Sequence, residues 1–100
     1  MSNKYMYLFT RSDLSPQQQI IQTAHAAHII GKNQDCNSIP NAVLIGAKTE
    51  YDLVNIKEYL EYFDIAHEIF YEPDIGQHTA IATYPIEGEQ RSPLRKFELM

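Results

Sequence analysis

Two periodicities of apolar residues divide the chain into short strands and longer helices. Residues 4–10 are rich in β-formers and almost continuously apolar, as in a strand that is covered on both faces. Further strands are expected at residues 42–47, 67–72 and 78–83. The intervening segments have helical spacing, so the predicted order is β-α-β-α-β-β.

The first helix is expected over residues 15–31. Ser15 can accept a hydrogen bond from a first-turn amide, Pro16 suits the first helical position, and Gln18 completes a capping box. Gly31 is a natural terminator. The apolar spacing runs through Ile20, Ile21, Ala24, Ala27 and His28.

A second helix is expected to begin after Thr49, which acts as its cap, with Asp52 at the third position. Its predicted inward stripe consists of Leu53, Ile56, Leu60 and Phe63. Near the carboxyl end, residues 93–97 are compatible with one helical turn.

These elements predict an α/β fold with a four-stranded mixed sheet and helices on its faces. A strand-helix-strand crossover makes the first two strands parallel. The short loop near Gly76 makes the last two strands antiparallel. Residues 1–100 contain no repeat or linker, so we predict a single domain.

Composition indicates a globular protein, with 44% apolar and 21% charged residues. No apolar run approaches the roughly 20 residues that span a bilayer, and no signal-like core follows Met1. We therefore expect a cytoplasmic protein with no membrane partner. The single cysteine, Cys36, excludes a thiolate zinc cluster and is expected to be a spectator.

Charge is unevenly distributed and argues against binding nucleic acid by bulk electrostatics. The net charge is −5, of which residues 1–33 contribute +2 and residues 34–100 contribute −7. A tRNA contact would need a local basic patch. The candidates are Lys4, Arg11, Lys32, Lys48, Arg91, Arg95 and Lys96.

Several polar residues are expected at strand ends, where ester-hydrolysis chemistry could be assembled. Asp74 could orient a water, and Thr79 could donate its hydroxyl to a tetrahedral intermediate. Asp13 and the amides that begin the first helix could meet them at one sheet edge, where a helix N-terminus favours anions.

Each of these residues also has a structural interpretation. Asp74 is a good turn former, Thr79 is an ordinary strand residue, and Asp13 can simply pair with Arg11. His25 and His28 have a spacing that can chelate metal, but no third ligand is evident. We therefore predict a hydrogen-bonded packing role for at least one of these two histidines, and neither a metal nor another cofactor.

The order of motifs resembles the type II (archaeal and eukaryotic) peptidyl-tRNA hydrolase family. Residues 11–14 resemble its R-x-D-L segment and residues 22–26 its Q-x-x-H-A helix. Residues 74–76 and 79–82 resemble its D-x-G loop and T-A-x-A strand. The resemblance implies metal-independent hydrolysis of the ester between a peptide and tRNA, with a homodimer as a common state. It also implies substrate-binding roles for Arg11, Gln18, Gln22 and His25.

Two departures from the family pattern bear on this assignment. The lysine that the family carries before its first helix falls at Gln18 or nearby, and a glutamine cannot pair with phosphate as a cation. The loop between the last two strands is shorter, so the family's catalytic aspartate corresponds to Glu72 or Asp74. Its threonine corresponds to Thr79.

The leading prediction is a peptidyl-tRNA hydrolase-like esterase with Asp74, Thr79 and Asp13 as catalytic residues. One alternative is an inactive member of the fold that binds a protein or nucleotide, possibly as a homodimer. Another is a hydrolase of small acyl esters or amides, because a fold does not determine its function.

Overall fold

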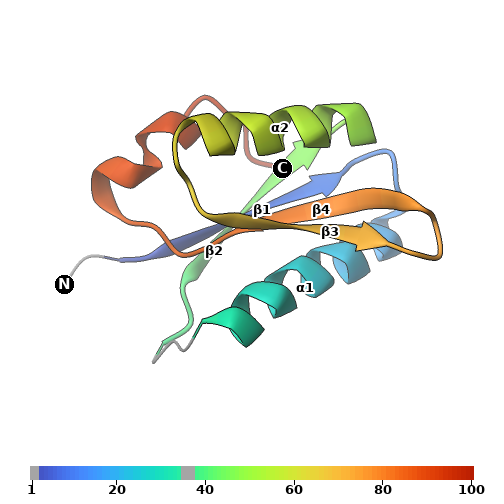
Figure 1. The fold of residues 1–100 in the computed structure, drawn as a ribbon, viewed down its shortest axis with the longest axis horizontal. Coiled ribbons are helices and arrows are strands. Elements are labelled where there is room, and N and C mark those ends of the chain that lie inside the picture. Colours follow the sequence, from blue (N-terminus) through green and yellow to red (C-terminus); the bar gives the residue numbers. More distant parts are fainter. Residues whose placement is uncertain (1–2, 35–37) are drawn as a thin grey trace.

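The computed structural model describes residues 3–34 and 38–100, and Cys36 lies outside them. Four strands form one mixed sheet (Figure 1): β1 (Tyr5–Arg11), β2 (Asn41–Ala47), β3 (His67–Glu72) and β4 (Gln77–Thr83). Their spatial order is β2-β1-β4-β3. The β1 and β2 pair is parallel, whereas β4 is antiparallel to both β1 and β3. The predicted α/β class and mixed sheet are therefore confirmed.

The two main helices cover opposite faces of the sheet (Figure 1). They are α1 (Pro16–Asn33) and α2 (Glu50–Tyr62). Both predicted caps form, because Ser15 accepts from the Gln18 amide at 3.2 Å and Thr49 accepts from the Asp52 amide at 3.2 Å. Within the described residues, no helix is long and apolar enough to cross a membrane.

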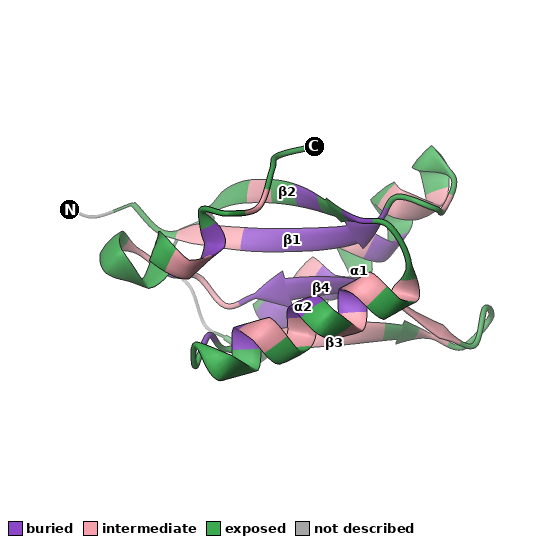
Figure 2. Cartoon of the chain, turned by 90° about the horizontal axis from the view of Figure 1, so that it is seen from above, coloured by how far each residue is buried: buried purple, intermediate pink, exposed green. Residues whose placement is uncertain are grey.

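Each face of the sheet builds its own apolar cluster, with β1 and β4 buried in the middle (Figure 2). The α2 face holds the larger cluster, centred on Phe9, Ile81 and Leu53. On the α1 face, Leu8, Ala80 and Ala82 pack against Ala26 and Ile30. Small alanines on β4 let α1 lie close to this part of the sheet.

The apolar spacing correctly predicted the helix α1, but its apolar positions do not mark the buried face. Ile20 is 71% exposed and Ile21 is 45% exposed, whereas the buried side chains of α1 are Gln22, Ala26 and Ile30. Apolar spacing alone does not reveal the buried face of α1, because that face includes Gln22. The side-chain amide of Gln22 can be buried because it is hydrogen-bonded.

Two helix ends also differ from expectation. Helix α1 continues past Gly31 to Asn33. Phe63 is 41% exposed because α2 ends at Tyr62, so it does not extend the buried stripe.

The carboxyl-terminal segment also departs from the predicted helical turn. A 3₁₀ helix, η1 (Gly88–Leu94), begins earlier than that turn. Leu94 is buried in the α2-face cluster, and Phe97 packs against the same cluster.

The Thr49 cap provides a direct test of the local structure. We expect Thr49→Ala to lower the free energy of unfolding by about 1 kcal/mol, because the Asp52 amide loses its acceptor. Thr49→Asp should retain most of the stability, since aspartate is also a good cap. Urea denaturation of both variants would measure the difference, and equal losses would contradict a capping role.

Candidate functional site

A β-bulge near the start of β4 determines which way Thr79 faces. Phe70 pairs with Ala80 and Tyr71 pairs with His78, so Thr79 is an additional residue in β4. Strict alternation would place Thr79 on the same face as Ile81, which packs towards α2. The bulge instead turns Thr79 towards α1, as bulges commonly re-aim side chains beside functional sites.

Thr79 and Gln22 form a fully buried hydrogen bond between the sheet and α1. The Thr79 hydroxyl donates to Gln22 Oε1 at 2.8 Å, and the two residues are 0% and 1% exposed. A buried amide that lacked partners would be strongly destabilising. This bond therefore determines the position of the Gln22 carboxamide.

The other end of the Gln22 carboxamide reaches a carboxylate and a second amide. Gln22 Nε2 donates to Glu72 Oε2 at 3.1 Å and to Gln18 Oε1 at 3.0 Å. Glu72 and Gln18 are both half-buried. We call Gln18, Gln22, Glu72 and Thr79 the amide cluster. It lies between the first turns of α1, the last residue of β3 and the start of β4.

A second polar group surrounds Arg11 at the same end of the sheet. Arg11 is buried and donates to both carboxylate oxygens of Asp13, at 3.0 and 2.7 Å. It also donates to Gln77 Oε1 at 2.6 Å and to the His78 carbonyl at 3.2 Å. The His78 amide donates to Glu50 at 2.8 Å, so side chains satisfy the backbone beside the bulge.

The Arg11–Asp13 pair changes the protonation properties of both groups. The hydrogen bond from Arg11 lowers the pKa of Asp13 below its ordinary value, and the same bond raises the pKa of Arg11. Asp13 is therefore an ionised partner of Arg11 near neutral pH. In this arrangement its carboxylate orients the arginine and does not contact the amide cluster.

The structure separates the two candidate carboxylates. Glu72 is joined to Thr79 through Gln22, whereas Asp74 is exposed in the turn after β3. The Asp74 backbone amide donates to Glu72 Oε1 at 3.3 Å. Across residues 3–34 and 38–100, the Asp74 carboxylate has no hydrogen-bond or ion-pair partner.

His25 lies one turn beyond Gln22 and has a packing contact. Its ring stacks on Phe70, with centroids 4.8 Å apart. In the part of the chain that the structure describes, no group of three or more histidine, cysteine, aspartate or glutamate side chains could hold a metal ion.

The amide cluster combines groups that ester chemistry uses. Glu72 has a carboxylate that can accept a proton from water. Gln22 contacts only the Oε1 atom of Gln18, so Gln18 Nε2 remains able to donate a hydrogen bond to a substrate oxygen. Thr79 donates its hydroxyl hydrogen to Gln22, so in this arrangement it holds Gln22 in place. Sequence reasoning selected three of the four members and gave the fourth, Glu72, as an alternative.

No protein-family model matches the sequence, and no curated protein matches it. Among solved structures, the fold is similar to that of a protein of unknown function, Atu0240, from Agrobacterium tumefaciens strain C58. The TM-score is 0.71 and the identity 15%, over 100% of this chain and 99% of that chain. This likeness shows a shared fold.

The Arg11–Asp13 pair should make stability depend on acid pH. Because the folded-state pKa of Asp13 is lowered, its contribution is complete above the ordinary value of 3.8 and is lost as pH falls through the lower, folded-state value. We expect Asp13→Asn to flatten the fall in urea midpoint below about pH 4. Asp74→Asn is the matched control, and an equal effect of both substitutions would contradict the assignment.

The buried bond between Thr79 and Gln22 should appear as energetic coupling. Gln22→Met and Thr79→Val should each destabilise by about 1–3 kcal/mol, because each leaves a buried partner unsatisfied. The double variant should lose less than the sum, with a coupling of about 0.5–3 kcal/mol. Urea denaturation of the four proteins would measure it, and additive losses would contradict the coupling.

Proposed function

We propose that this protein is a metal-independent esterase of the peptidyl-tRNA hydrolase type, and that the amide cluster is its active site. The observation that carries the proposal is the bond series from Thr79 through Gln22 to Glu72. It links a helix glutamine, a carboxylate and a strand threonine, and the family motifs contain these three residue types in that chain order.

In the proposed reaction, Glu72 removes a proton from a water that attacks the ester carbonyl. Gln18 Nε2 stabilises the oxyanion, and the ester bond then breaks as the ribose oxygen leaves and takes up a proton. The products are a peptide acid and tRNA with a free 3′ end. Gln22 and Thr79 are positioning residues that orient Glu72 and Gln18.

For the phosphate contact we propose a different cation from Arg11, which the motifs suggested. Arg11 is committed to Asp13 and Gln77, and Arg91 lies over the Tyr5 ring at 3.5 Å. Lys48 is exposed and directly follows β2. Because β1 and β2 are parallel, both strands terminate at the same end of the sheet. We therefore assign Lys48 and the first turn of α1 to the tRNA backbone.

Hydrolysis of an N-blocked aminoacyl-tRNA by the purified protein tests the proposal. We expect Glu72→Gln to lower kcat by about 100-fold or more, because a general base contributes at least this factor. Asp74→Asn, an exposed carboxylate in the adjacent turn, is the matched control and should keep the wild-type rate. Lys48→Gln should raise KM about 3-fold and leave kcat unchanged, since it removes one phosphate contact.

Two results would overturn these assignments. Release no faster than the uncatalysed background would remove the esterase proposal. Equal rates for wild type and Glu72→Gln, with loss in Asp74→Asn, would transfer the base to Asp74. Circular dichroism of each variant establishes that the fold is retained.

A second candidate is a binding module without catalysis. Two observations favour it. The Thr79 hydroxyl donates its hydrogen to Gln22 and so does not donate to a substrate. Position 18 is a glutamine, so the amide cluster contains no cation. Binding of a deacylated tRNA or a nucleotide, without ester cleavage and without any effect of Glu72→Gln, would support it.

A further inference from the structure

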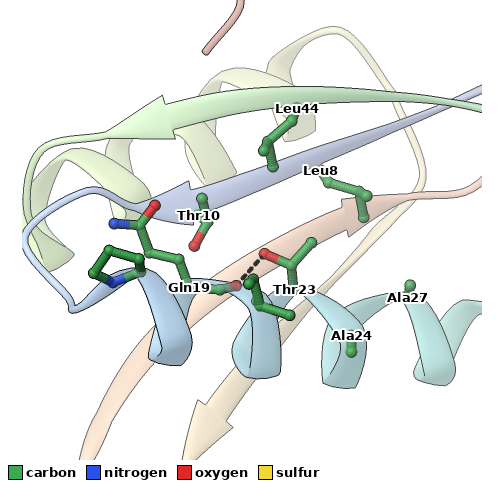
Figure 3. Close-up of a pocket in the computed structure, with 9 residues that line it drawn as sticks. Leu8, Thr10, Gln19, Thr23, Ala24, Ala27 and Leu44 are labelled. Carbon is green, nitrogen blue, oxygen red and sulfur yellow. Dashed lines mark hydrogen bonds between the residues drawn. The ribbon is translucent and has the colours of Figure 1, made fainter.

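An apolar pocket lies beside α1, between that helix and the strands β1 and β2 (Figure 3). Its volume is about 510 Å³, within the range of small-molecule sites. The amide cluster lies towards β3 and β4, so the pocket is on the other side of the helix from it.

The wall of this pocket is mostly aliphatic and carries no charged residue. Leu8, Leu44, Ile20 and Ala27 contribute to it, with Leu44 41% exposed and Ile20 71% exposed. Two of its polar residues are already committed: Gln19 Nε2 donates to the Leu14 carbonyl at 2.9 Å, and Thr23 donates to the Gln19 carbonyl at 2.6 Å.

The third polar residue, Thr10, has an unsatisfied hydroxyl. Thr10 is 0% exposed, and its Oγ1 has no hydrogen-bond partner among the described residues. The hydroxyl points from β1 towards α1 (Figure 3). A buried hydroxyl without a partner is destabilising, so a ligand that supplied an acceptor there would gain affinity.

We propose that this pocket binds a small uncharged molecule with an apolar body and one hydrogen-bond acceptor, which the Thr10 hydroxyl contacts. The absence of charge from the wall disfavours an ionised ligand, because its charge would be desolvated without a partner. Because Thr10 is fully buried, we infer that the ligand reaches its hydroxyl by displacing the half-buried Gln19 side chain, which lies beside it (Figure 3).

A second copy of this chain is the rival occupant, because Ile20 and Leu44 are exposed. A small molecule fits the pocket better for a geometric reason. The Thr10 hydroxyl is fully buried, so only an atom that enters the pocket past Gln19 can reach it.

The test is titration of the protein with 2-octanone, which has an acyclic apolar body and one carbonyl acceptor. We expect saturable shifts in the methyl NMR signals of Leu8, Ile20 and Leu44. Octanoate, with a similar chain and a negative charge, should bind at least 10-fold more weakly. Thr10→Val should weaken 2-octanone binding about 3- to 10-fold, whereas Thr10→Ser should retain it.

Ala24→Phe gives a second variant that does not depend on Thr10. Ala24 lines the pocket from an exposed position of α1, so a larger side chain should block binding while the melting temperature is kept. Absence of saturable shifts, or equal affinity of wild type and Thr10→Val, would overturn the proposal. Concentration-dependent dimerisation that shifts the same methyl signals without ligand would assign the pocket to a second copy.

Discussion

The buried hydrogen bond between Thr79 and Gln22 connects the sheet to α1, beside the apolar cluster on that face. Both side chains are almost fully buried, and each satisfies the other across 2.8 Å. Without this bond the two polar groups would oppose the packing of Ala26 and Ile30 against β4. Gln22 can occupy the buried face of the helix because Thr79 lies opposite it.

The bulge in β4 makes that bond possible. It adds Thr79 to the strand between His78 and Ala80 and so directs two neighbouring side chains towards α1. Arg11 and Glu50 bind the His78 carbonyl and amide. The ionised Asp13 in turn holds Arg11, and so the two polar groups at this end of the sheet stabilise one local geometry.

The first turns of α1 separate two surfaces with different chemistry. Gln18 and Gln22 face β3 and β4, where the Glu72 carboxylate is available to a polar substrate. Ile20 and Ala27 line the apolar pocket beside β1 and β2. One helix therefore presents a candidate catalytic surface and a candidate binding surface, and substitutions on either side can be interpreted separately.

The amino-acid sequence by itself determined the element order, both helix caps and the mixed sheet. These features depend on local signals, such as the Ser15 and Thr49 side chains and the β-forming residues of 67–72. It also identified Gln22 and Thr79 as site candidates, through their resemblance to family motifs.

The tertiary structure alone decided which residues meet. The buried face of α1 includes Gln22 and excludes Ile20, because a satisfied amide can replace an apolar side chain in the core. The orientation of Thr79 depends on one additional residue in β4, which no alternation pattern reveals. The link from Gln22 to Glu72 joins residues 50 positions apart in the chain, and only the packing of α1 across β3 and β4 brings them together.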